Sequence, residues 1–233
     1  YTILPDDTEP PVAICQNITA QLDATGSVTI VAADVDGGST DNVGIVSYAI
    51  DIDTFSCVDV GPNTVTLTVT DAAGNFDTCT ATVTVEDNIA PVATCQAFIA
   101  QLDATGNVII TASDIDNGST DNCGIASLSV SPASFTCADI GANTVTLTVI
   151  DVNGNSSTCS TTVTVEDNVA PIATCQPFTA QLDANGIVTI SGADVDGGSA
   201  DACGIDTLSV SPNTFSCADI GANTVTLTVT DNN

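Results

Sequence analysis

The sequence predicts an all-β protein built from tandem repeats, and two observations carry that prediction. Cys15, Cys95 and Cys175 are spaced by 80 residues, and the segments around them recur without insertions, so each copy is one unit stacked on the next. Within a copy, Thr144–Val149 alternates apolar and polar residues with the period of a half-buried strand, and no stretch has a helical period. About six or seven such strands per copy indicate an immunoglobulin-like β-sandwich, and the stacked copies are expected to form an extended rod.

The expected strands of the second copy are bounded by turn residues. Turns at Asp103–Asn107 and Asp151–Asn155 each separate two strands, and Ser131-Pro132 ends another. The strands are expected at 98–102, 108–110, 125–130, 144–149 and 161–165, with a further one between 131 and 143. Aromatic residues make up only 3% of the chain, so each core is expected to be thin and supplemented by disulfides.

The repeat also sets the expected domain boundaries. Residues 1–7 align with the end of a preceding repeat, and the last copy stops before its final strand. We therefore expect the end of a preceding repeat at 1–7, repeat 1 at 8–87, repeat 2 at 88–167 and a truncated repeat 3 at 168–233. The chain is expected to be a piece of a longer protein, and none of its apolar runs is long enough to insert into a membrane.

The charge balance excludes several classes of function. The chain has 29 acidic residues and no Lys, Arg or His, which gives a formal charge of −29. Such a chain cannot neutralise phosphates, so nucleic acids and anionic membrane surfaces are not expected partners. A catalytic triad needs His, and the paired Asp residues recur beside turn residues without a visible cleft, so we do not expect an enzyme. The uncompensated charge instead favours divalent cations or a salty medium.

The ten cysteines fall at four positions of the repeat, a framework typical of disulfide-stapled extracytoplasmic domains. Zinc is disfavoured because the chain has no Cys-x-x-Cys pair and no His. Four cysteines allow three connectivities, and we expect the one that joins the first and last strands and closes a local loop, worth roughly 3 kcal/mol. The expected pairs are Cys15–Cys79, Cys95–Cys159, Cys123–Cys137 and Cys203–Cys217, with Cys57 and Cys175 unpaired.

An acidic loop recurs in each copy and is the place where metal chemistry is expected. Asp34–Asn42 returns as Asp114–Asn122 and Asp194–Ala202, and its D-x-D-G oxygen ligands suit calcium. If the first two strands run down and back, this loop meets the preceding linker and the Asp151 turn at one pole of the copy, so that carboxylates of neighbouring copies converge. The alternative is ordinary turn chemistry, in which Asp side chains cap turns without a metal.

The candidate calcium ligands are the aspartates of this loop, of the linkers and of the hairpin turns. In sequence order they are Asp7, Asp34, Asp36, Asp41, Asp71, Asp87, Asp114, Asp116, Asp121, Asp151, Asp167, Asp194, Asp196, Asp201 and Asp231. Calcium at these repeat junctions would stiffen the linkers and stabilise the folded array by mass action.

The motifs of the second copy resemble those of hyalin-type (HYR) repeats. The resemblance rests on Asp121-Asn122-Cys123-Gly124, Phe135 spaced from Ile140-Gly141, the Asp151 turn and the linker Val165–Pro171. The acidic, Thr-rich composition is similar to that of repeats in giant Bacteroidota cell-surface adhesins, including those of gliding motility. That resemblance implies export by type IX secretion and display as a long extracellular surface filament. The first copy departs from the four-Cys pattern at Val43, which leaves Cys57 without a partner.

These observations favour a structural function over a binding function. The preferred interpretation is a stalk or spacer segment of an extracellular surface adhesin filament, which holds a distal binding region away from the cell. Its partners would be neighbouring repeats of the same chain and surface-anchoring proteins. The alternative is a calcium-dependent adhesive module whose repeats bind extracellular glycans or other cells directly. Near-identical loops with few aromatic residues favour the spacer.

Overall fold

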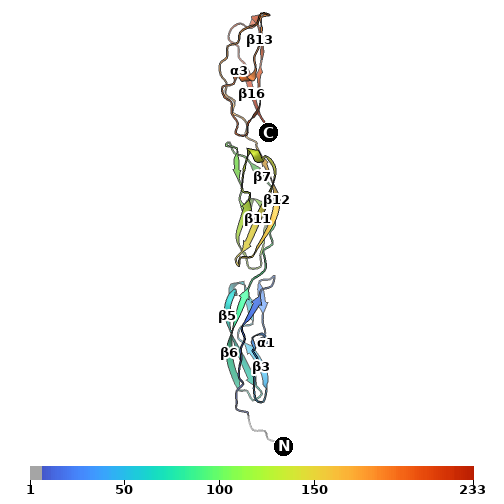
Figure 1. The fold of residues 1–233 in the computed structure, drawn as a ribbon, viewed down its shortest axis with the longest axis vertical. Helices are drawn as coiled ribbons and strands as arrows, with labels where there is room; N and C mark the ends of the chain where they lie inside the picture. The colour runs from blue at the N-terminus through green and yellow to red at the C-terminus, as the bar shows by residue number, and fades with distance from the viewer. Residues whose placement is uncertain (1–6) are drawn as a thin grey trace. The chain divides into compact units, whose positions relative to one another are not determined.

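The computed structural model describes residues 7–233 and is nearly all β, with 48% of residues in strands and 9% in helices (Figure 1). The chain forms two compact units. Of the described residues, one unit contains 7–94 together with Gly118–Leu128 and Thr148–Thr158, and the other contains the rest. This division passes through the second copy, so the boundaries at 7, 87 and 167 and the extended rod stay predictions. Residues 1–6 of the first expected segment lie outside the described part of the chain.

The order of elements is the same in the first two copies. The first copy contains β1 (Ile18–Gln21), β2 (Ser27–Thr29), α1 (Ala32–Val35), β3 (Ile45–Ile50), β4 (Thr54–Ser56), η1 (Cys57–Asp59), β5 (Gly61–Asp71) and β6 (Phe76–Glu86). The second contains β7 (Phe98–Gln101), β8 (Asn107–Ile109), α2 (Ala112–Ile115), β9 (Ile125–Ser131), β10 (Ser134–Thr136), η2 (Cys137–Asp139), β11 (Gly141–Asp151) and β12 (Ser156–Glu166). The third contains β13 (Ile187–Thr189), α3 (Gly192–Val195), β14 (Ile205–Ser211), β15 (Thr214–Ser216), η3 (Cys217–Asp219) and β16 (Thr226–Asp231).

Two sheets form the sandwich of the first copy. One has the strand order β1-β6-β5-β3, and the other pairs β2 with β4. β5 is antiparallel to β6, whereas β1 runs parallel to β6 with Ile18 opposite Val83. The second copy has the same arrangement, with the orders β7-β12-β11-β9 and β8-β10. These paired sheets confirm the predicted all-β, immunoglobulin-like sandwich.

The period-two alternation sets the core of the first copy. Val65, Leu67 and Val69 of β5 have no exposed surface and pack in one cluster with Val83 of β6 and Phe55 of β4. The threonines between them turn to the other face of the strand. The core is small, as the low aromatic content predicts, and four partly buried cysteines pack against it: Cys15, Cys57, Cys79 and Cys123.

The third copy has a smaller core than the first. Its buried cluster contains only Ile190, Val195 and Leu227 among the described residues. A groove of about 1060 Å³, lined in part by Phe178 and Leu182, runs beside them. In the first copy β1 and β6 supply the corresponding cover, and no described residue of the third copy forms a strand equivalent to β6.

Each copy also contains one four-residue helix that the sequence analysis did not predict. A single helical turn is too short to show a periodic pattern. The carboxylate of the third helical residue closes its start, because Asp114 accepts a 2.6 Å hydrogen bond from the backbone N–H of Thr111. A Thr-x-x-Asp or Ser-x-x-Asp spacing is the sequence signal for such a turn, and it is present in the second and third copies.

The described cysteines form four disulfides, and two of these join successive copies. Cys15–Cys79 and Cys95–Cys159 agree with the pairs expected within a copy. The predicted pairs Cys123–Cys137 and Cys203–Cys217 are wrong, as is the prediction that Cys57 is unpaired. The structure instead has Cys57–Cys123 and Cys137–Cys203, each with a sequence separation of 66 residues.

The strand arrangement explains why the local pairing fails. Cys123 and Cys137 flank β9 and β10, which belong to different sheets and do not form a hairpin. The chain between the two cysteines therefore does not fold back on itself, as a short disulfide would need. Cys57 instead lies against the next copy, with its Sγ 3.5 Å from the carbonyl oxygen of Asn122. The bridge to Cys123 spans 5.3 Å between Cα atoms.

Glycine is required where this disulfide meets the turn between β1 and β2. Gly26 has a φ of 74°, and a Cβ atom there would lie 2.7 Å from Cys57 Sγ and 2.9 Å from the Asn122 carbonyl oxygen. A larger residue would therefore strain the backbone and push against the disulfide at once. The close approach of Gly26 is part of how the two copies are fastened.

Thiol labelling distinguishes the two pairing schemes. Among the described cysteines, Cys175 and Cys217 are free and exposed. We therefore expect two thiols per unreduced chain to react with an alkylating reagent, and peptide mapping should locate the label at these two positions. The sequence-based scheme also leaves two thiols, but at Cys57 and Cys175. Label at Cys57 in place of Cys217 would contradict the structure.

Candidate functional site

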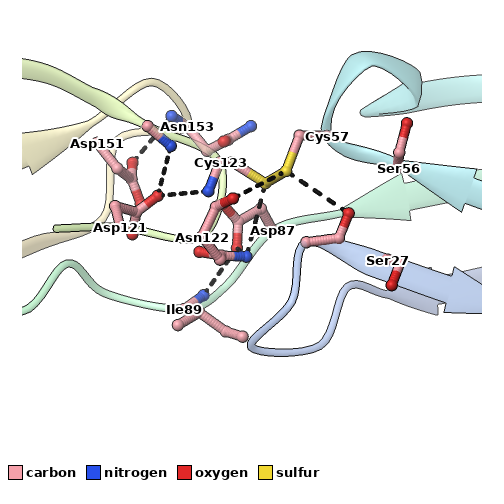
Figure 2. Close-up of a disulfide and its surroundings, with 12 residues drawn as sticks. Ser27, Ser56, Cys57, Asp87, Ile89, Asp121, Asn122, Cys123, Asp151 and Asn153 are labelled. Atoms are coloured by element: carbon pink, nitrogen blue, oxygen red, sulfur yellow. Dashed lines mark hydrogen bonds between the residues drawn. A yellow bond between two sulfur atoms is a disulfide. The ribbon is translucent and has the colours of Figure 1, made fainter.

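Three aspartates from separate segments meet where the first copy joins the second. Asp87 follows β6, Asp121 lies in the loop before β9, and Asp151 ends β11. Each offers a carboxylate oxygen, and these oxygens lie within 4.8 Å of one another. We call these three residues the Asp87 cluster. Figure 2 shows the cluster beside the Cys57–Cys123 disulfide.

In two of these carboxylates one oxygen is held by N–H donors and the other is not. Asp121 Oδ2 accepts from the backbone N–H groups of Cys123 at 2.8 Å and Gly124 at 2.9 Å. Asp87 Oδ1 accepts from the N–H of Ile89 at 3.1 Å and from Asn122 Nδ2 at 3.2 Å. The opposite oxygens, Asp87 Oδ2 and Asp121 Oδ1, are buried and have no hydrogen-bond partner within residues 7–233.

The third carboxylate has both oxygens engaged. Asp151 is only 1% exposed. Its Oδ1 accepts from the N–H groups of Asn153 and Asn155 at 2.8 Å, and its Oδ2 accepts from Asn155 Nδ2 at 2.8 Å. Asn155 Nδ2 also donates to the carbonyl oxygen of Asp87 at 3.0 Å. The hairpin turn of the second copy thus holds the linker in place through one amide.

The first copy has a second cluster of the same kind. Asp7, Asp41 and Asp71 occupy the equivalent positions, and their ligand oxygens also lie within 4.8 Å of one another. Asp7 Oδ2 and Asp41 Oδ1 are again buried without a partner among the described residues. The arrangement is therefore a property of the repeat and not of one junction.

The third copy departs from this pattern. The group found there is Asp167, Asp201 and Cys203, and the sulfur of Cys203 is already bonded to Cys137. A disulfide sulfur is not the thiolate that binds metals. Asp231, which the sequence predicts as a ligand here, is not in the group; its Oδ1 accepts from the Asn233 N–H at 3.1 Å. Of the predicted ligands in this copy, only Asp167 and Asp201 contribute carboxylates to the group.

The D-x-D pairs at the start of the acidic loop lie outside all three groups. Asp34, Asp114 and Asp194 instead close the short helices by accepting from the backbone N–H three residues before them. Asp36 and Asp196 accept from the N–H groups of Ser39 at 3.0 Å and Ser199 at 2.9 Å. Asp116 lies directly after α2, and its backbone forms an isolated antiparallel β-bridge with that of Cys95. For these residues the structure supports the turn interpretation.

Sequence analysis also missed two amides that shape the cluster. Asn122 is beside Asp121 and donates to Asp87, while Asn155 connects Asp151 to the linker. Asn at both positions looked like ordinary turn composition. The signal that could have identified them is recurrence, because Asn42 returns as Asn122 in the acidic loop and Asn75 returns as Asn155 in the hairpin turn.

Hydrogen bonds lower the pKa of many turn aspartates. The Thr105 hydroxyl, followed by the backbone N–H groups of Thr105 and Asn107, lowers the pKa of Asp103 below its ordinary value of 3.8. The Ser39 hydroxyl does the same to the pKa of Asp36. In each case the donors stabilise the ionised carboxylate, so the turn is most stable when the group is charged.

These shifts predict how stability changes in acid. A carboxyl whose folded pKa is depressed stabilises the fold above its unfolded pKa near 3.8, and this contribution is lost as the pH falls through the lower folded value. Between pH 7 and pH 4 the protonation of other acids relieves repulsion in a chain of charge −29. We therefore expect the free energy of unfolding to be largest near pH 4 and to fall toward pH 2. Urea unfolding at low salt without divalent ions measures it; a steady decline from pH 7 to pH 4 would contradict the repulsion argument.

One protein-family model matches the first copy. Residues 6–85 match the family model of the HYR domain. No curated protein sequence matches the chain. None of the helices in the described part is long and apolar enough to cross a membrane.

Several multidomain structures are similar at low identity. A protocadherin γB3 EC1-4 structure shares 14% identity over 69% of this chain and 50% of its own, with a TM-score of 0.35. Protocadherin γB7 EC1-4 shares 13% over 95% and 68%, with a TM-score of 0.34. The titin I-band fragment I67–I69 shares 12% over 97% and 89%, with a TM-score of 0.39. The chain thus spans half the length of the γB3 fragment.

The HYR match and the disulfide framework define the class of protein. The HYR fold is an immunoglobulin-like, non-catalytic fold of adhesion and structural modules. Four disulfides in a chain of 233 residues are typical of an oxidising, extracellular environment. These findings define an extracellular, adhesion-type module, in which the match to the HYR domain covers residues 6–85.

Proposed function

We propose that this chain is a spacer segment of a long extracellular surface adhesin, which holds a distal binding region away from the cell. The observation that carries the proposal is the pair of disulfides between successive copies, Cys57–Cys123 and Cys137–Cys203. A module that binds a ligand by itself has no need of covalent bonds to its neighbours. A spacer does, because its copies must stay in register while load passes through them.

The loops support the same conclusion. The loop Asp34–Asn42 differs from Asp114–Asn122 and from Asp194–Ala202 at two of nine positions each, and aromatic residues are 3% of the chain. Binding surfaces are enriched in aromatic anchors and vary with the ligand they recognise. Repeated polar loops with turn-forming Asp and Gly fit a surface that faces solvent.

The finer proposal is that the parent is a filament of a gliding bacterium, exported by type IX secretion and held by surface-anchoring proteins. It rests on the acidic, Thr-rich composition without Lys or Arg. An antiserum against this chain should then label the outside of intact cells as extended filaments. Labelling only after the cells are lysed would contradict the surface location.

Binding assays separate the spacer from the adhesive alternative. The full oxidised chain, immobilised and exposed to extracellular polysaccharides and to whole cells in calcium, is expected to show no saturable binding. Saturable binding that a chelator abolishes would instead support the calcium-dependent adhesive module. Saturable binding that persists in chelator would reject both proposals, because the loops would then bind a ligand without a metal.

A further inference from the structure

We propose that the Asp87 cluster is a calcium site, with Asp87, Asp121 and Asp151 as its carboxylate ligands. The proposal stands on the geometry of the cluster and does not depend on the proposed function. All three residues belong to one compact unit of the structure.

The first reason is a buried oxygen without a partner. Asp87 is 5% exposed, and its Oδ2 has no hydrogen-bond donor in the described chain, although its ligand oxygen lies within 4.8 Å of those of Asp121 and Asp151. A buried carboxylate without a counter-charge is costly and persists only when a cation or a proton compensates it. The chain cannot supply the cation, since it has no Lys, Arg or His.

The second reason is that the free oxygens are held in position. The N–H groups of Cys123 and Gly124 fix Asp121 through Oδ2, and the N–H of Ile89 fixes Asp87 through Oδ1. Each carboxylate therefore presents its other oxygen without further rearrangement. The amide of Asn122 also steadies Asp87, because its Nδ2 donates to Asp87 Oδ1 at 3.2 Å.

The ligand chemistry selects calcium among common cations. Calcium takes six to eight oxygen ligands in flexible geometry, and carboxylates, an amide oxygen and water are typical of its sites. Magnesium demands near-ideal octahedral geometry and keeps most of its water, which suits a partly buried set of protein oxygens less well. Zinc prefers His and thiolate ligands, and the cluster has neither.

A bound ion would connect two copies of the repeat. Asp87 belongs to the linker after β6, whereas Asp121 and Asp151 belong to the second copy. The Cys57–Cys123 disulfide lies two residues from Asp121 and fastens the same junction covalently. Calcium would therefore fix the linker to the copy that follows it, while the disulfide limits how far the two can separate.

The test is a calorimetric calcium titration of the full oxidised chain and of matched variants. The titration is done in about 150 mM salt, where the Debye length is about 8 Å. Asp121→Asn and Asp87→Asn each remove one ligand charge with little change of shape. Asp206→Asn is the control, because it removes the same charge from an exposed residue of β14. Calcium ions held elsewhere by the general negative charge add equally to the stoichiometry of each variant, so they cancel when the variants are compared.

We expect Asp121→Asn and Asp87→Asn each to bind one calcium ion fewer than the native chain, and Asp206→Asn to bind as many as the native chain. The calcium-dependent rise in melting temperature should shrink in the first two variants only. Circular dichroism and an unchanged count of two free thiols establish that the variants are folded with the native disulfides. Equal stoichiometry in all four proteins would overturn the proposal, as would a native chain that binds no calcium at about 1 mM.

Discussion

Replacing Cys57 and Cys123 together by serine is expected to lower the free energy of unfolding by about 4 kcal/mol in the chain-entropy model, since the disulfide closes a loop with a separation of 66 residues. Most of this loss comes from the greater freedom of the unfolded chain, because the closed loop crosses from one copy into the next. Urea unfolding of the oxidised protein, followed by circular dichroism, measures the change as a lower midpoint.

Both cysteines must be replaced, because a single change would leave a reactive thiol beside other disulfides. The control is the double variant Cys175→Ser, Cys217→Ser, which removes the two free and exposed thiols and should leave stability nearly unchanged. If the two double variants unfold at the same urea concentration, the disulfide between copies does not contribute to stability as the loop length predicts.

The replacement of Leu67 by alanine is expected to cost roughly 3–5 kcal/mol, because the side chain is fully buried and the thin core has few residues that can close the cavity. The matched control is Thr64→Ala in the same strand, where the side chain is exposed and the cost should be below about 1 kcal/mol. Thermal and urea unfolding of the two variants give the comparison. A similar loss from both changes would mean that β5 is not packed as the structure has it.

The alternation of apolar and polar residues was sufficient to predict the sandwich. Val145, Leu147 and Val149 on one face of a strand require a buried partner layer, and the turn at Asp151 requires a hairpin. The convergence of Asp87, Asp121 and Asp151 also follows from strand directions, since a linker, a loop and a hairpin turn then meet at one end of a copy. These inferences use only local periodicity and chain connectivity.

The disulfide partners and the role of Asp114 depend on three-dimensional distances, which no local sequence pattern contains. The predicted pairing of Cys123 with Cys137 closes a local loop, and that prediction treats one copy by itself. The partner of Cys123 is Cys57, which the preceding copy presents against the Asn122 carbonyl. Likewise, the D-x-D-G spacing predicted Asp114 as a calcium ligand, whereas the four-residue helix α2 uses its Oδ2 to close the first turn.

The four disulfide loops overlap, and this limits how far the chain can be stretched. Cys57 lies inside the loop closed by Cys15–Cys79, and Cys137 lies inside the loop closed by Cys95–Cys159. A pull between Cys15 and Cys203 is carried by three disulfides and by the short stretches 57–79 and 123–137. That route reaches roughly 140 Å when taut, against roughly 650 Å for the same chain without crosslinks. Even a mechanically unfolded molecule would therefore remain a short tether, and its slack would be released only when a disulfide is reduced.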